Sequence, residues 1–160
     1  MKKFAIGLAF LLMSVCASAQ IDLGGNIGIR VIDARVVVNI SPDIAYRINN
    51  SMVVGTYLSY YTGVERFGVT PYYRWMFCPI GNDIRLFVSA SAPMWFGSDY
   101  RSIGAIVRPG LSWRLAGNAY VAAHIGAFGY NSVTTSDGRS SSWVGQLDRD
   151  TVNVGLYFSL

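Results

Sequence analysis

Lysine and glutamate, two charged residues that coat most soluble proteins, are almost missing from this sequence. The 160 residues contain two lysines, Lys2 and Lys3, and a single glutamate, Glu65. Charged residues make up 14% of the chain, whereas a soluble domain usually carries about a quarter or more on its surface. This composition argues against an ordinary water-facing surface.

Cysteine and histidine are also scarce. Cys16 and Cys78 are the only cysteines, and His124 is the only histidine. One histidine excludes a multi-histidine metal site. Cys78 has no partner for an internal disulfide once a leader containing Cys16 is removed. We therefore expect neither a metal nor another cofactor.

The first 19 residues have the order of a secretory signal peptide: two lysines, an apolar run from Phe4 to Cys16, and then small residues. The run, about 13 residues long, is too short to span a bilayer comfortably as a helix. We predict cleavage after Ala19, which leaves 20–160 as one domain. The alternative is a lipoprotein anchored through Cys16, but the preceding Val15 is not the small residue expected there.

Beyond the leader, eleven arginines stand against nine acidic residues, which gives a formal charge of +2. This charge is too small to indicate a nucleic-acid partner. The high isoelectric point therefore says little about function.

Apolar residues recur at every second position rather than at helical spacing. In 66–77, for example, the apolar set is Phe67, Val69, Pro71, Tyr73, Trp75 and Phe77. Eight such segments follow the leader, at 21–30, 36–48, 52–61, 66–77, 84–95, 103–114, 119–130 and 151–160. Their lengths suit tilted strands that cross a bilayer, which need about 9–11 residues.

The connections between these segments alternate in length. Short turns are predicted at 49–51, 78–83 and 116–118, and longer polar loops at 31–34, 62–66, 97–102 and 131–150. Short turns at one end and longer loops at the other are typical of outer-membrane barrels. The sequence therefore predicts an all-β fold: an eight-stranded antiparallel up-and-down transmembrane β-barrel with both chain ends on the short-turn side.

Three stretches carry a family resemblance: VNISPDIAYRINNSMVVGTYLSYYTG, FGVTPYYRWMF and IVRPGLSWRLAGNAYVAAHIGAFGY. They resemble the small outer-membrane β-barrel (porin-like) proteins of Gram-negative bacteria, whose strands carry S-P-x-x-x-Y, P-x-x-R-[YW] and R-P-G-L-S-[YW] patterns. The likeness covers 36–130 and the final strand. It implies the bacterial outer membrane as location, membrane lipid and the barrel assembly machinery as partners, and a monomer. Such barrels usually end in an aromatic residue, whereas this chain ends in Leu160.

Strand parity predicts which charged side chains face the lumen. These are Asp22, Arg30, Asp43, Arg47, Arg66, Arg74, Arg85, Arg108 and Arg114. Asp22, Arg47, Arg85 and Arg114 lie near the short turns, at the expected periplasmic mouth. A charge buried at mid-height must be paired, so we expect Asp43 to bond Arg74, Arg108 or both. Tyr57, Tyr72 and His124 are expected to be polar neighbours of this network.

Three prolines, Pro42, Pro71 and Pro109, fall on the apolar parity of their strands. Proline removes one ladder hydrogen bond. A bulge or a locally broken ladder is therefore expected at each of them.

These features favour a barrel with a packed polar lumen that serves envelope structure or surface interaction, since an eight-stranded barrel is just wide enough for side chains to fill. The loop 131–150, with Trp143 as an isolated aromatic and Arg139 beside it, is the candidate contact for an unidentified surface ligand. A narrow pore is the first alternative, and it would lean toward anions because inward arginines outnumber inward acids. A lipid-modifying enzyme is the second. It is disfavoured because the His-x-Ser pair of lipid A deacylase barrels is absent at His124.

Overall fold

The structure is a computed structural model that describes residues 20–32, 35–61, 66–136, 138–146 and 153–160. The predicted signal peptide at 1–19 and the loop residues 62–65 lie outside these ranges, as does the Arg30 side chain. No helix among the described residues is long and apolar enough to cross a membrane.

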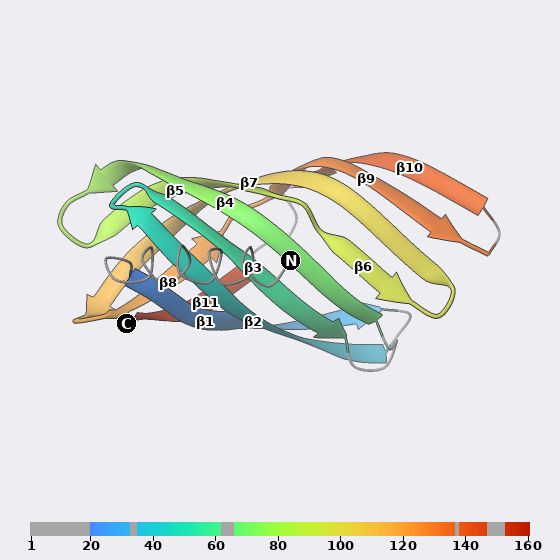
Figure 1. Ribbon diagram of the computed structural model, residues 1–160, viewed down its shortest axis with the longest axis horizontal. Coiled ribbons are helices and arrows are strands. Elements are labelled where there is room, and N and C mark those ends of the chain that lie inside the picture. The colour runs from blue at the N-terminus through green and yellow to red at the C-terminus, as the bar shows by residue number, and fades with distance from the viewer. Residues whose placement is uncertain (1–19, 33–34, 62–65, 137, 147–152) are drawn as a thin grey trace, which may run out of the picture.

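The described chain folds into eleven β-strands (Figure 1). They are β1 (Gln20–Ile32), β2 (Arg35–Asn49), β3 (Met52–Tyr61), β4 (Arg66–Ile80), β5 (Ile84–Ser91), β6 (Met94–Gly97), β7 (Tyr100–Ala116), β8 (Ala119–His124), β9 (Ala127–Thr135), β10 (Gly138–Gln146) and β11 (Asn153–Ser159).

The strands pair side by side, all antiparallel, and close into an eight-stranded barrel. Strands β1 to β4 follow one another, β5 and β6 share the next place in the wall, and β7 follows. Strands β8 and β9 both pair with β7, and β11 lies between β8 and β1, where it closes the ring. This confirms the predicted fold class.

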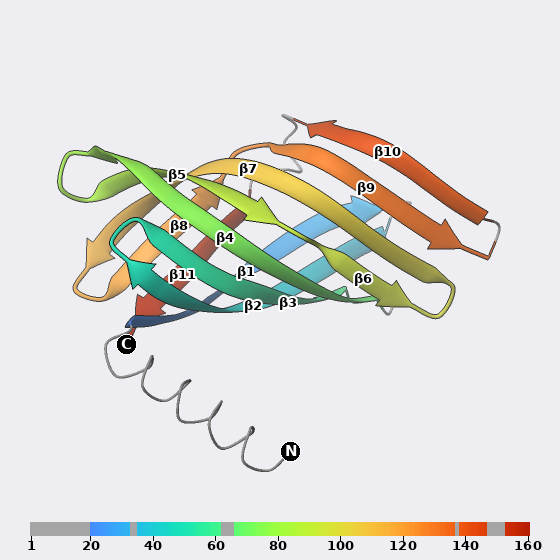
Figure 2. The same ribbon diagram turned by 45° about the horizontal axis from the view of Figure 1, so that its top comes forward.

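The two ends of the barrel differ, as the sequence predicts. The turns β2–β3, β4–β5 and β7–β8 lie at one end together with Gln20 and the C-terminus, here called the short-turn end (Figure 1). The opposite end, here called the hairpin end, carries the β6–β7 and β9–β10 connections (Figure 2).

The prediction of a long loop at 131–150 is wrong for most of its length. Strand β9 continues to Thr135, and β10 pairs with it from Gly138 to Gln146. The serine- and glycine-rich composition of this segment obscured the pattern, because a ladder depends on backbone groups and tolerates polar side chains. Among the described residues, β10 pairs with β9 alone.

The three prolines coincide with interruptions in the wall, which confirms the expected bends. Pairing of β2 with β3 lapses between Ile40 and Asp43, around Pro42. The strand opposite Pro71 breaks between β5 and β6. Beside Pro109, the register of β7 shifts by one residue between β8 and β9, where Gly126 has a φ of 77°. All three prolines are exposed on the outside of the wall.

The wall is apolar outside and polar inside. The exposed large apolar side chains include Leu23, Ile44, Leu58, Phe67, Trp75, Ile103, Trp113, Phe128 and Leu156. The buried polar ones include Asp22, Asn26, Asp43, Ser59, Arg74, Ser89 and His124. This reverses the arrangement of a soluble barrel, in which the apolar face is buried.

Candidate functional site in the barrel lumen

Arg74 lies at the centre of the lumen and has no solvent-exposed surface. Its Nη2 donates to the Tyr57 hydroxyl at 2.9 Å and its Nε donates to Ser89 Oγ at 3.3 Å. Its Cζ lies 4.5 Å from the ring centroid of Phe87 and 5.5 Å from that of Tyr157. The charge is therefore held by hydroxyl oxygens and by the negative faces of aromatic rings.

Asp43 is 4% exposed, and its Oδ2 accepts a hydrogen bond from the Tyr72 hydroxyl at 2.9 Å. Tyr72 stacks on Tyr57 with a centroid separation of 4.6 Å. Asp43 and Arg74 are thus linked through two tyrosines, and the expected direct bond between them is not formed. Asp43 Oδ1 and Arg74 Nη1 have no hydrogen-bond partner among the described residues.

A glycine explains how Tyr72 reaches Asp43. Tyr72 lies opposite Gly55 in the β3–β4 ladder, and Asp43 is on β2, the strand beyond. A Cβ atom at Gly55 would lie 2.7 Å from the Tyr72 ring and 2.8 Å from the Ala45 Cβ. The missing side chain therefore gives the Tyr72 ring the space to cross β3.

His124 joins the same network from β8. It is buried, and its Nε2 lies 3.5 Å from Ser89 Oγ, the atom that also accepts from Arg74. Its ring meets Phe87 edge-on at 5.1 Å. Arg108 is half-buried and lies opposite Ser89 in the β5–β7 ladder. Among the described residues, no group of three or more His, Cys, Asp or Glu side chains is arranged to hold a metal ion.

Asp22 forms a second polar layer nearer the short-turn end. Its carboxylate is fully buried and accepts from Arg47 Nη2 at 3.0 Å and from the Tyr120 hydroxyl at 2.9 Å. Ser159 Oγ also donates to it. Sequence reasoning placed Asp22 and Arg47 at one level but did not pair them. The available signal was their position at the same end of adjacent antiparallel strands.

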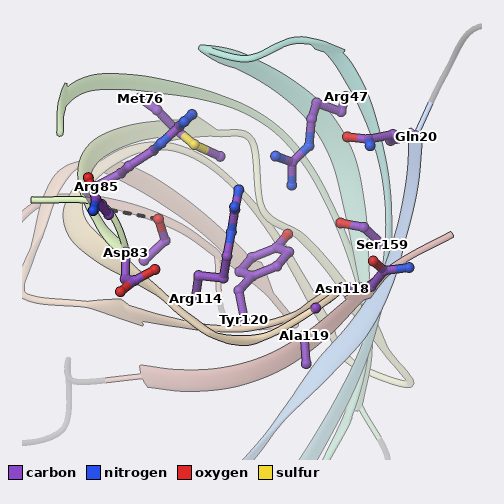
Figure 3. A pocket seen from close by; sticks show the side chains of 13 residues that line it. Gln20, Arg47, Met76, Asp83, Arg85, Arg114, Asn118, Ala119, Tyr120 and Ser159 are labelled. Carbon is purple, nitrogen blue, oxygen red and sulfur yellow. Dashed lines mark hydrogen bonds between the residues drawn. The ribbon is translucent and has the colours of Figure 1, made fainter.

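A cavity of about 270 Å³ opens at the short-turn end (Figure 3). Arg47, Arg85 and Arg114 line it, with Asp83 and Tyr120 among the other lining residues. Arg85 donates to the Asn50 carbonyl at 2.7 Å, while Arg114 is exposed. The four charges predicted at this mouth thus lie at or just beneath the cavity, which has an excess of positive charge.

At the hairpin end, Trp143 is 76% exposed but not isolated, contrary to the sequence prediction. Its ring meets Tyr130 edge-on at 5.6 Å and lies 6.5 Å from Phe128. Arg139, four residues before Trp143 on the same strand, donates from Nε to Ser132 Oγ at 3.0 Å. Both residues belong to the outward face of the β9–β10 hairpin, since they share parity with the outward Phe128 and Tyr130.

Two solved β-barrels have a similar backbone. A de novo designed transmembrane β-barrel covers 88% of this chain and 95% of its own, at 9% identity and a TM-score of 0.56. The N-terminal β-barrel domain of Pseudomonas aeruginosa OprF covers 89% and 96%, at 15% identity and a TM-score of 0.53. This chain has the fold of a small transmembrane β-barrel.

Neisserial surface protein A (NspA) is a third structure of this fold, with 16% identity, coverage of 89% and 96%, and a TM-score of 0.50. No family model matches the sequence of the present barrel. No curated protein sequence matches it either. At these identities the similarity shows the fold alone. The function must be argued from the residues of this barrel.

Proposed function

We propose that this chain is an integral outer-membrane β-barrel with a plugged lumen, serving the envelope as a structural or surface-interaction protein. The observation that carries the proposal is the complete burial of Arg74 in the centre of the lumen. Phe87 and Tyr157 pack around it and are themselves 1% and 0% exposed.

The outer surface supports a membrane location. Soluble monomers rarely expose contiguous apolar patches larger than a few hundred Å², whereas apolar side chains cover the outside of this barrel on nearly every strand. Aromatic residues also gather toward both ends of the wall. Trp75, Phe77, Trp113 and Phe158 lie toward the short-turn end, and Tyr60, Phe67, Phe96 and Tyr130 lie toward the hairpin end.

The interior supports a packed lumen rather than a channel. Val53, Phe87 and Tyr157 fill space between the polar layers and have almost no exposed surface. The aromatic pair Tyr120–Tyr157, stacked at 5.0 Å, connects the Asp22 layer with the Arg74 layer. An ion moving through the barrel would have to displace these rings and the guanidinium group.

The arginine-rich cavity favours a second candidate, a narrow pore that prefers anions. Arg47, Arg85 and Arg114 would concentrate anions at that mouth, since a cleft lined by one sign of charge focuses the field. Asp22 and Arg74 are nevertheless fully buried and do not line this cavity.

Conductance of the purified full chain in a planar bilayer distinguishes the two candidates. A plugged lumen predicts no stable unitary conductance in chloride solution. Insertion must be verified in the same preparation by heat-modifiable gel migration. Reproducible conductance steps with anion preference would overturn the plugged barrel in favour of the pore.

A further inference from the structure

We propose that Arg101 and Arg139, with Thr134 between them, form a binding site on the outside of the barrel for the phosphate group of a membrane lipid. The inference rests on the proposed function, because it requires the barrel to stand in a bilayer with its hairpin end at the outer leaflet.

The ladder places the three residues in one row. Arg101 on β7 lies directly opposite Thr134 on β9, and Thr134 lies directly opposite Arg139 on β10. Directly opposed residues in an antiparallel ladder point to the same face. Two strand spacings separate the Cα atoms of the arginines by about 10 Å, a distance that two long side chains can close around one phosphate. Both arginines are exposed.

These two arginines are unlike the others whose side chains the structure describes. Both face the outside of the barrel, because the row continues from Arg101 through Phe96 to Phe67, and these two aromatic residues are exposed on the outer wall. The remaining described arginines have the opposite parity, toward the lumen or its mouths: Arg47, Arg66, Arg74, Arg85, Arg108 and Arg114. Arginine on the outer face is thus confined to one place in the part of the chain described.

The height of the row matches a lipid headgroup. On the outer parity of β7 the apolar run extends from Trp113 to Ile103, and Arg101 is the next outward residue. That run spans about ten residues, about 33 Å along the strand and about 25 Å across a bilayer at a tilt of about 40°. An apolar band about 25 Å tall is what a transmembrane barrel presents to the hydrocarbon, so Arg101 falls at its upper border.

Aromatic side chains border the site on the hydrocarbon side. Trp143 and Tyr130 lie two outward positions from Arg139 and Thr134, toward the short-turn end, and their rings meet at 5.6 Å. Phe96 flanks Arg101 within the row itself, and its ring centroid lies 5.8 Å from the Arg101 Cζ. Tryptophan and tyrosine favour the membrane interface, where one end of the ring is apolar and the other is hydrated. The arginines therefore lie beside an interfacial belt.

Phosphate is the group that this chemistry fits. A guanidinium binds phosphate oxygens in a bidentate manner, and anionic headgroups attract cationic side chains near the surface. The hydrogen bond from Arg139 Nε to Ser132 Oγ holds the Arg139 side chain against the wall. The Thr134 hydroxyl, exposed between the arginines, supplies a further donor.

Native mass spectrometry of the full chain in detergent tests the proposal by titration. The probes are bisphosphorylated lipid A, the same lipid with its phosphates removed, and inorganic phosphate. We expect the wild type to bind the phosphorylated lipid. Arg101→Gln with Arg139→Gln should bind it at least about tenfold more weakly, because two charged hydrogen-bonding groups are lost. Arg66→Gln, which removes an arginine of lumenal parity at the same end of the barrel, should bind like the wild type.

Three results would overturn the inference. The first is that the double variant binds phosphorylated lipid A as tightly as the wild type does. The second is that the wild type binds the dephosphorylated lipid as tightly as the phosphorylated one. The third is that it binds inorganic phosphate as tightly as the lipid. A double lysine variant that binds like the wild type would also contradict the bidentate geometry. Failure of the wild type to insert into lipid vesicles would contradict the proposed function itself. Normal insertion without phosphate preference would contradict this inference alone.

Discussion

Arg47 forms an ion pair of 3.0 Å with Asp22, and the pair joins the first two strands at the end of the barrel where β1 begins and β11 ends. The carboxylate is fully buried, whereas the arginine side chain keeps 15% of its surface exposed. Tyr120 and Ser159 donate to the same carboxylate from β8 and from the end of β11. Asp22 therefore connects both sides of the closing seam.

Asp22→Ala should destabilise the barrel by about 2–4 kcal/mol, because it leaves a part-buried guanidinium and a buried tyrosine hydroxyl without their acceptor. Urea unfolding in lipid vesicles, followed by tryptophan fluorescence, measures the change. Asp83→Ala is the matched control, since Asp83 is exposed at the same mouth and should change stability by less than about 0.5 kcal/mol. Equal effects of the two substitutions would show that the Asp22 pair has no special role.

Tyr57→Phe should cost about 1–3 kcal/mol of unfolding free energy, because it removes the hydroxyl that accepts from the buried Arg74. Tyr60→Phe makes the same chemical change on the same strand, but Tyr60 is 47% exposed on the outer wall. It should have an effect within about 0.5 kcal/mol. The two variants are compared by the same urea titration, and a larger loss for Tyr60→Phe would argue against the Arg74 network.

Gly55→Ala should destabilise the barrel by about 1–3 kcal/mol, because the new methyl group overlaps the Tyr72 ring and the Ala45 side chain. Gly145→Ala, whose Cβ would meet Phe128 at an ordinary 3.8 Å, is the control and should be nearly neutral. Heat-modifiable migration in detergent gels ranks the variants. If Gly55→Ala resists heat as well as the wild type, Tyr72 does not need this gap.

Cys78 tests the orientation of the barrel. It is exposed near the β4–β5 turn at the short-turn end, and Ser98 is exposed in the β6–β7 turn at the hairpin end. In intact cells, an impermeant maleimide should label Ser98→Cys in a Cys78→Ser background and leave wild-type Cys78 unlabelled. The reverse pattern would place the short turns outside the cell.

Much of the wall could be predicted from the sequence because strand periodicity and turn length are local signals. The alternation of Phe67, Tyr73 and Trp75 with Thr70 and Arg74 separates the two faces of the strand. The near absence of lysine and glutamate then indicates that the polar face is the lumen rather than a surface in water. The same parity placed Pro42, Pro71 and Pro109 outside, where the wall is interrupted.

Partners across the lumen could not be predicted, because they depend on how several strands pack together. The bond from Tyr72 to Asp43 needs the gap at Gly55 on the strand between them. The β9–β10 hairpin was missed for a different reason. Its pairs, such as Ser141 with Ser132, are polar on both strands, so the apolar alternation that reveals the other strands is weak there.

The tyrosine-mediated environment of Arg74 has a consequence for how the barrel responds to salt. Screening by dissolved ions acts on charges that water can reach and affects buried ones much less. Arg74 is sealed among hydroxyl groups and ring faces, so added salt should barely change its contribution to the free energy of unfolding. Arg114 at the open mouth and Arg101 at the border of the apolar band have exposed side chains, and ionic strength should act on them first. Salt should therefore change the contribution of the arginines at the two ends to the free energy of unfolding, and leave that of the buried interior almost unchanged.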